Sequence, residues 1–451
     1  MSRKPRETAP DWSAAARRKP ATEPGDGSLL IVGARVLDPA SGLDGTANLG
    51  IRDGRIDHVG KERPAGRYAR TLEANGQWLM PGLVDLCARF REPGQTHKAN
   101  FASETAAAQA GGITAVLIPP DTQPVVDTPA MLMRLQRIAR GAGGLDVHLL
   151  GALTRGLQGE ALAELSALKT AGAIGLSNGL VPLRDALIAR RALDYARGLK
   201  LTTHVFAQDG VLAAGGCAHE GPVATRLGLS PIPSAAEVAA IRTWITLVED
   251  TGAAVHFCRL STARGAGLVE SAQKRGLPVT ADVAAHQLFL TADDVDGFDA
   301  RCHLIPPLRA AEDRDALRAA VRKGVIGAIC SDHQPHEADA KINPFPLTEP
   351  GASALETLLP LTLALVRDGV LTPLQAAQRL SLGPARIASV DGGRLAKGAA
   401  AHLVLVDADA EWLLHPERLR SAGRNTPFAG RRLQGRVTRC LHAGLEVFAA
   451  D

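Results

Sequence analysis

Aromatic residues make up only 3% of this 451-residue sequence, and neither sign of charge is in strong excess, since the formal net charge is +4. Lysine and arginine are mostly dispersed, apart from a short N-terminal run and a stretch near the C-terminus, RLRSAGRNTPFAGRRLQGRVTR. Proteins that bind single-stranded nucleic acid combine such cations with aromatic platforms, and this stretch holds one aromatic residue, Phe428. The sequence therefore argues against nucleic-acid binding. We expect the stretch to be a solvated face, with contact to a partner protein as the alternative.

Long hydrophobic runs and paired cysteines are also missing. The longest apolar stretch, LETLLPLTLALV at 355–366, falls short of the about 20 residues that a membrane-spanning helix needs. Residues 1–27 contain no run of signal-peptide type and are rich in alanine, proline and charge, so we predict a disordered tail. The six cysteines form no CxxC pair, which favours reduced thiols in a cytoplasmic protein over a disulfide framework or a structural zinc site.

The remaining sequence has the composition of an ordinary α/β protein, with 45% hydrophobic and 22% charged residues. Residues 28–78 give short β-type runs, and this pattern returns after about residue 393. Between them, eight short apolar runs alternate with amphipathic helical stretches such as FASETAAAQAG and DRDALRAAVRKG. This alternation predicts a TIM (β/α)₈ barrel at 80–392, flanked by a β-domain that both chain ends build, 28–79 and 393–451. An open doubly wound sheet is the weaker alternative, because no G-x-G-x-x-G fingerprint follows any strand.

Reactive residues of such a barrel sit at the carboxyl ends of its strands, and the motifs found there resemble those of one family. The matching stretches are PGLVDL with FREPGQTHK, AAAQAGGITAV, GALTRGLQGEALAELSALKTAGA, LGLSPIPSAAE, IPPLRAAEDRDAL, SDHQPH and GRNTPFAGRRLQGRV. From about residue 28 to its end, the chain resembles the dihydroorotases of the amidohydrolase superfamily. The resemblance implies a TIM barrel with a split β-domain and one or two divalent metals. In that family the metals activate water for attack on a cyclic amide in pyrimidine biosynthesis.

Several metal-ligand positions of that family are occupied here by other residues. The family ends its first barrel strand in His-x-His, and the resemblance places Cys87 and Arg89 at these positions. A thiolate can bind zinc, but a guanidinium stays protonated and has no lone pair. The bridging carboxylate of the family, or the carboxylated lysine that replaces it in other branches, falls at Asn178 in GLSNGL. An anionic bridge is therefore missing.

Two ligand positions are retained on the later strands. By resemblance, His204 in LTTHVFAQ keeps one histidine ligand, and Asp332 in SDHQPH keeps the carboxylate that ligates metal and moves protons. Arg259 in VHFCRLST replaces the second histidine. Catalytic zinc needs about three protein ligands and an open position for water, and Cys87 is the one further donor. We therefore predict no cofactor, with zinc as the alternative.

The two arginines suggest what replaces the metals. A carboxylate in a barrel mouth without a metal or a cation would be a poorly compensated charge. We therefore expect Arg89 and Arg259 to supply the positive charge and to pair with Asp332. The plainer interpretations are that Cys87 and Cys258 are small buried side chains, and that Asp332 is only a member of a structural ion pair.

The substrate-binding positions are partly retained. By resemblance, Arg91 in FREPG and His336 in SDHQPH hold the carboxylate of the substrate. Asp121 in IPPDTQP and Ile305 in LIPPLR stand where the family has asparagine. The anion at position 121 gives the alternative that Arg91 pairs with Asp121 instead of a ligand.

The other histidines have plain structural interpretations. We expect His256 and His286 to be core or rim histidines whose hydrogen bonds are satisfied, and the same interpretation is open for His204. His333, and alternatively His336, could cap a loop.

These observations leave two main functions. The favoured one is a dihydroorotase-like pseudoenzyme, whose barrel serves as a scaffold. The resemblance implies the catalytic chain of aspartate transcarbamoylase as its partner in an oligomer. The alternative is an active cyclic amidohydrolase with an altered metal site built on Cys87, His204 and Asp332. A third, weaker hypothesis keeps Arg91 and His336 as a binding site without turnover.

Overall fold

The computed structural model describes residues 27–182 and 184–450, so the predicted disordered tail lies outside the described residues except for its last residue. None of the helices in these two ranges is long and apolar enough to cross a membrane. All six cysteines lie in the described part of the chain, and all are free thiols, in agreement with the absence of a CxxC pair.

Eight parallel strands form the predicted barrel, in the order β15-β14-β13-β10-β9-β8-β7-β6. Their number and their position between residues 80 and 392 match the eight apolar runs expected from the sequence, so the TIM-barrel prediction is confirmed. The strands are almost entirely buried, because helices cover the outside of the barrel and side chains fill the inside. Their bounds are β6 Leu83–Asp85, β7 Ile113–Ile118, β8 Asp146–Ala152, β9 Gly175–Ser177, β10 Thr202–Phe206, β13 Val255–Cys258, β14 Val279–Ala284 and β15 Ala328–Cys330.

The barrel closes just beyond the ends of its first and last strands. Ala88 and His333 form a parallel bridge. The Arg89 N–H donates to the His333 carbonyl at 2.9 Å, and the His333 N–H donates to the Cys87 carbonyl at 3.2 Å. The backbone around Cys87 and Arg89 therefore lies directly beside the residues that follow β15.

Several of the helices that cover the barrel present one apolar stripe to it. Helix α8, for example, buries Leu317, Ala320 and Val321, which recur at helical spacing. Its first turn carries Glu312 and Asp313 and its last turn carries basic residues, which is the favourable arrangement for the helix dipole. The helix bounds are α1 Phe101–Ala110, α2 Pro129–Ala142, α3 Leu165–Thr170, α4 Ala186–Gly198, α5 Pro222–Leu227, α6 Ser234–Thr251, α7 Ala263–Lys274, α8 Ala311–Lys323, α9 Leu358–Arg367, α10 Pro373–Ala377 and α11 Gly383–Ala388.

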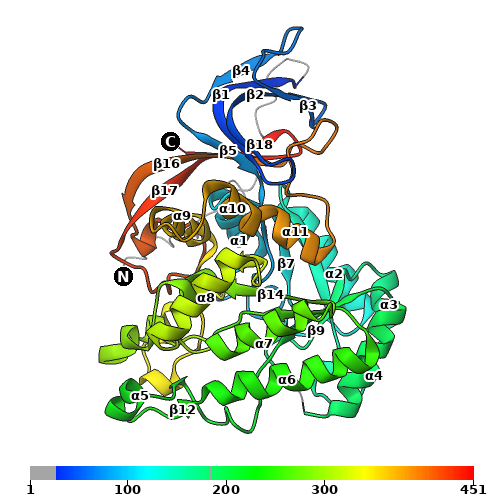
Figure 1. The fold of residues 1–451 in the computed structure, drawn as a ribbon, viewed down its shortest axis with the longest axis vertical. Helices are drawn as coiled ribbons and strands as arrows, with labels where there is room; N and C mark the ends of the chain where they lie inside the picture. Colours follow the sequence, from blue (N-terminus) through cyan, green and yellow to red (C-terminus); the bar gives the residue numbers. More distant parts are fainter. Residues whose placement is uncertain (1–26, 183, 451) are drawn as a thin grey trace, which may run out of the picture.

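The two ends of the chain share a second sheet, in the order β18-β17-β16-β5-β1-β2-β3, with β4 paired to β1. Strand β5 joins the two ends, because it pairs with β1 on one side and with β16 on the other. The expected β-domain built from both ends is therefore present, beside the barrel in Figure 1. Its strands are β1 Leu29–Asp38, β2 Leu43–Arg52, β3 Arg55–Gly60, β4 Arg70–Glu73, β5 Trp78–Pro81, β16 Leu403–Leu413, β17 Arg432–His442 and β18 Leu445–Ala449. A short third sheet pairs β11 Ala218–His219 with β12 Pro231–Ile232.

The first four residues of strand β16 are buried on both faces of the strand. Leu403 and Leu405 belong to the core of the β-domain, whereas Val404 and Val406 belong to the large core that includes the barrel. Successive side chains of a strand point to opposite faces, so one strand serves two cores. The β-domain is thus packed onto the barrel by continuous apolar contact.

Candidate functional site

Three residues at the carboxyl ends of the barrel strands have backbone conformations that are costly for side chains other than glycine. Arg91, Arg259 and Asp332 have φ angles of 61°, 55° and 47°. Such left-handed residues cost on the order of 1–3 kcal/mol each and are concentrated at functional sites. The motif residues therefore lie where a barrel of this kind places its chemistry.

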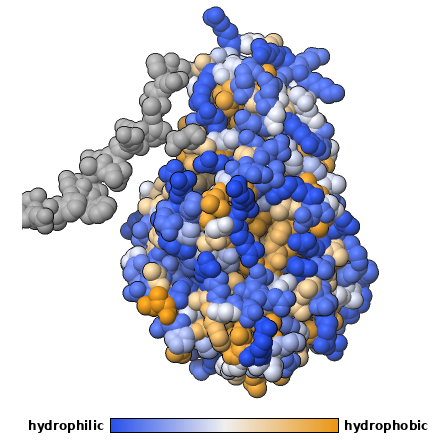
Figure 2. Space-filling model, turned by 90° about the vertical axis from the view of Figure 1, so that its left-hand side faces the viewer, coloured by the Kyte–Doolittle hydropathy of each residue, from blue (hydrophilic) through white to orange (hydrophobic). Residues whose placement is uncertain are grey.

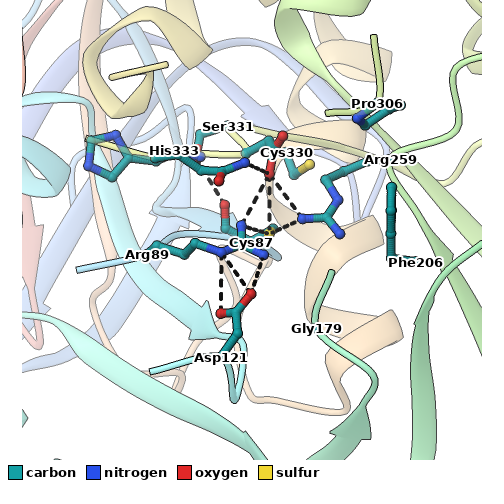
Figure 3. A network of polar contacts seen from close by, with 12 residues as sticks. Cys87, Arg89, Asp121, Gly179, Phe206, Arg259, Pro306, Cys330, Ser331 and His333 are labelled. Carbon is teal, nitrogen blue, oxygen red and sulfur yellow. Dashed lines mark hydrogen bonds and ion pairs between the residues drawn. The ribbon is translucent and has the colours of Figure 1, made fainter. Parts of the chain in front are cut away.

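Asp332 and Arg259 form a buried ion pair. The Arg259 Nη1 lies 3.1 Å from the Asp332 Oδ1, and both side chains are only 2% exposed. The Arg259 guanidinium also stacks over the Phe206 ring, 5.0 Å from its centroid. In Figure 3, Arg259 and Arg89 approach Cys87 from opposite sides. The expected pairing of Arg259 with Asp332 is therefore present.

Arg89 links two carboxylates. Its Nη1 lies 3.4 Å from the Asp332 Oδ1. Its Nη2 and Nε donate to the Asp121 Oδ2 at 2.8 and 3.0 Å, a two-pronged contact (Figure 3). Burial opposes ionisation of Asp121, but the adjacent Arg89 holds the pKa of this carboxyl below its usual value. The result is a chain of alternating charges, Asp121, Arg89, Asp332 and Arg259, which we call the ion-pair network.

The suggestion that Arg91 pairs with Asp121 is wrong, because Arg89 makes that contact. The Arg91 guanidinium instead donates to the Pro335 carbonyl at 3.0 Å and lies 3.0 Å from the His336 Nε2. Arg89 lies on the closing segment of the barrel, and its backbone N–H donates to the His333 carbonyl.

His336 lies within a group of cations. The Lys98 Nζ is 3.1 Å from its Nδ1, while the same Nζ pairs with the Glu349 Oε2 at 2.5 Å. Burial, with Arg91 and Lys98 nearby, lowers the pKa of His336 to about 2, so its ring is neutral. The structure thus brings the two retained substrate-binding positions together, but their polar groups contact each other.

Cys87 lies at the centre of the ion-pair network. Its Sγ is 3.2 Å from the Arg259 Nη1, 3.5 Å from the Arg89 Nη1 and 3.6 Å from the Asp332 Oδ1. Burial raises the pKa of the Cys87 thiol to about 12, although the two arginines act in the opposite direction. Zinc binds the thiolate, so a metal ion here would have to displace the thiol proton in the presence of two neighbouring guanidinium groups.

His204 does not join Asp332. The His204 and His256 ring centroids are 5.0 Å apart, and with Cys258 these residues form a group whose potential ligand atoms all lie within 4.8 Å of one another. Within the described ranges, no such group of three contains Asp332, so Cys87, His204 and Asp332 do not assemble into one site. The donors present therefore do not fit the metal centre that the family implies.

Asn178, at the position of the bridging carboxylate, has a structural use. Its Nδ2 donates to the carbonyls of Val181 and Phe206 at 2.6 and 3.1 Å, and its Oδ1 accepts from the Phe206 N–H at 2.9 Å. A carboxylate could not make the two donations. Asn178 thus holds the loop after β9 to the end of β10.

The expectation of satisfied hydrogen bonds holds for His256 but not for His286. His256 is satisfied as expected, with Thr280 and Asp282 at 2.9 Å each. The expectation for His286 is wrong, because neither of its buried ring nitrogens has a hydrogen-bond partner in the described part of the chain. Burial lowers its pKa to about 4, so the ring is neutral. The Nδ1 of His204 is likewise unpaired among the described residues.

Two buried groups were missed by the sequence analysis. Glu104 accepts from His333 across 2.7 Å, with both side chains completely buried. His333 also accepts the Ala354 N–H through its Nδ1, so its role includes the suggested loop contact. Lys98 was missed although it ends the stretch FREPGQTHK. The sequence offered one signal for these two residues. Lys98 lies within a stretch that resembles the family, and Glu104 lies just before another such stretch.

Comparisons with known proteins agree with this architecture. The family model described as Dihydro-orotase-like matches residues 76–264. A dihydroorotase-like protein of Pseudomonas aeruginosa is 50% identical over 92% of this chain and 98% of its own length. A protein of Anaeromyxobacter dehalogenans named dihydroorotase is 44% identical over 94% of this chain and 98% of its own length. Among solved structures, an L-hydantoinase from Arthrobacter aurescens matches the fold, with a TM-score of 0.85 and 22% identity over 93% of this chain and 96% of its own.

Proposed function

Because the chain belongs to the dihydroorotase family of the amidohydrolase superfamily, we propose that it is a non-catalytic member that acts as a structural subunit in pyrimidine biosynthesis. Its partner in this proposal is the catalytic chain of aspartate transcarbamoylase. The ion-pair network carries the proposal, because two guanidinium groups occupy ligand positions and compensate the charge of Asp332.

The electrostatics of the network support the loss of the metal centre. Two cations and two anions, namely Arg89, Arg259, Asp121 and Asp332, balance one another in a buried region. A divalent cation placed there would face both guanidinium groups at short range and would gain no net negative charge. No hydrolytic step is therefore assigned to this barrel.

Exposed apolar side chains near the barrel mouth support a role in assembly. Val211 lies in the loop after β10, and Ile342 and Leu347 lie in the segment after β15, with exposures of 87%, 75% and 71%. Both segments follow the carboxyl ends of barrel strands. Figure 2 shows that the visible face is mostly hydrophilic, with separate apolar patches on it. A partner that covered this end of the barrel would bury the apolar surface of these side chains.

One observation favours a second candidate, an active cyclic amidohydrolase with an altered metal site. The group of His204, His256 and Cys258 offers three donor atoms within 4.8 Å. Against this candidate, both ring nitrogens of His256 are already hydrogen-bonded, to Thr280 and Asp282. Burial also raises the pKa of the Cys258 thiol well above its usual value. A binding site without turnover at Arg91 and His336 is disfavoured, because these two groups contact each other.

Co-expression with the aspartate transcarbamoylase catalytic chain of the same organism tests the proposed assembly. We expect the two chains to elute together in size-exclusion chromatography, and transcarbamoylase activity to fall at least about tenfold when this chain is omitted. Substituting Val211, Ile342 and Leu347 with glutamate is expected to abolish co-elution, because charge at the core of an interface is costly to desolvate. Met133→Glu on helix α2, 51% exposed in the native protein, is the matched control. Separate elution of the native chains, with full transcarbamoylase activity, would contradict the proposal.

A further inference from the structure

A second cluster of potential metal ligands lies where the β-domain meets the barrel. Asp146 is the first residue of barrel strand β8, His402 directly precedes β16, and His442 ends β17. Strands β16 and β17 are antiparallel with Leu403 opposite Leu441, so the neighbouring histidines come together across the pair. The backbone register therefore places two imidazoles over one carboxylate of the other domain.

The geometry of this junction cluster is convergent. The Nε2 atoms of His442 and His402 lie 3.1 and 3.7 Å from the two carboxylate oxygens of Asp146. The two ring centroids are 4.5 Å apart. One donor atom from each residue lies within 4.8 Å of the others. Two imidazole nitrogens and one carboxylate oxygen are a donor set that zinc takes in proteins.

One donor atom in the junction cluster has no well-aligned hydrogen bond among the described residues. The His442 Nε2 atom is buried and lies 3.1 Å from the Asp146 Oδ1, but this contact lacks hydrogen-bond geometry. A metal ion between the ring and the carboxylate would use both donor atoms.

We propose that Asp146, His402 and His442 bind a divalent transition metal of the zinc class, which ties the β-domain to the barrel. A cavity of about 20 Å³ borders Asp146 and His402 but not His442, and it has room for about one water molecule. Asp391 also lines this cavity, but it pairs with Arg394 at 2.7 Å and is not counted as a ligand.

Binding has one identifiable cost. The Ala443 N–H donates to the His402 Nδ1 at 3.3 Å. A metal on the Nε2 leaves the proton on the Nδ1, so this long contact is given up when the metal binds. The site is independent of the barrel interior and of the proposed function, because its ligands come from the ends of β8, β16 and β17.

Zinc binding at pH 7.5 tests the proposal on the full-length chain after treatment with a chelator. Bound zinc is measured by elemental analysis after desalting. We expect the His402→Gln/His442→Gln variant to hold one zinc ion per chain fewer than the native chain. At zinc concentrations about a hundredfold above the dissociation constant, the melting temperature of the native chain is expected to rise by about 3 °C. The double variant is expected to show no such rise.

Two further variants keep the test decisive. Asp146→Asn removes one ligand at a half-exposed position, and its zinc content should fall in the same way even if the double variant folds poorly. His58→Gln, on β3 of the β-domain and hydrogen-bonded to the Glu62 carbonyl, is the matched control and should bind zinc as the native chain does. Zinc content that is equal in the native chain and in all these variants would overturn the proposal. An unchanged melting temperature of the native chain, with no bound zinc, would show that the three residues form only an ion-pair cluster.

Discussion

Replacing Asp332 with asparagine is expected to destabilise the protein by about 3–5 kcal/mol, because one partner is removed from a buried ion pair while the other stays charged. Asp332 is the only carboxylate within ion-pair distance of Arg259 among the described residues, and both side chains are buried. Arg89 keeps Asp121 after the change, so the cost comes mainly from Arg259. Denaturation by urea, followed by circular dichroism, measures the effect.

A double variant separates the charge from the loss of packing. In Asp332→Asn with Arg259→Met, no unpaired charge remains and the methionine fills part of the same volume. We expect it to be more stable than Asp332→Asn alone by at least about 2 kcal/mol. If the protein were instead a metal enzyme that had lost its metal, the Asp332 carboxylate itself would be the unpaired buried charge. Removing that charge would then not destabilise the protein. Asp332→Asn would then be as stable as the native chain or more stable, which would rule out the ion-pair network as a stabilising unit.

Restoring the family's ligands is expected to create a zinc site in the barrel. The variant carries Cys87→His, Arg89→His and Arg259→His, with Asp121→Asn to remove the carboxylate that Arg89 compensates. These changes remove two cations beside Asp332 and leave one negative charge, together with several imidazoles. Zinc needs about three protein ligands, so we expect bound zinc to rise by about one equivalent per chain, measured by elemental analysis.

This experiment needs a starting variant without the junction cluster and a matched control. His402→Gln/His442→Gln removes the junction cluster, so that any zinc gained belongs to the barrel. The matched control keeps Arg259 and carries the other changes. Its guanidinium still pairs with Asp332 at 3.1 Å and blocks that ligand. Equal zinc content in both variants would show that the arginines are not what excludes metal.

The fold could be predicted from sequence because its signals are local. The eight apolar runs, each short and followed by a helix or a loop, determine the barrel strands, and the β-type pattern at both chain ends marks the β-domain. Strand β5 (Trp78–Pro81) joins the two ends through pairing with β1 and β16. That pairing gives the β-domain a continuous sheet.

The site could be predicted only in part, because residue identity does not fix side-chain direction. The resemblance to the family implied that Arg89 and Arg259 stand at ligand positions. It did not show that Arg89 contacts Asp121 while Arg91 contacts Pro335 and His336, since these contacts depend on how the loops after the barrel strands meet. The donations from Asn178 likewise depend on how the loop after β9 meets β10.

The junction cluster shows the same limit over longer distances. Asp146, His402 and His442 are far apart in the sequence and belong to no shared motif. They meet because the register of β16 with β17 aligns two histidines and because that sheet packs on the amino-terminal end of β8. Such a site can be found only once the strand pairing and the domain packing are known.

The most direct test of the central claim, that the ion-pair network has replaced the hydrolytic metal centre, is a dihydroorotase assay. The purified native chain is supplied with zinc and dihydroorotate, alone and together with aspartate transcarbamoylase. The account predicts no hydrolysis above the uncatalysed rate in either case. Turnover of about 1 s⁻¹ or faster, within the ordinary range of enzymes, would contradict it.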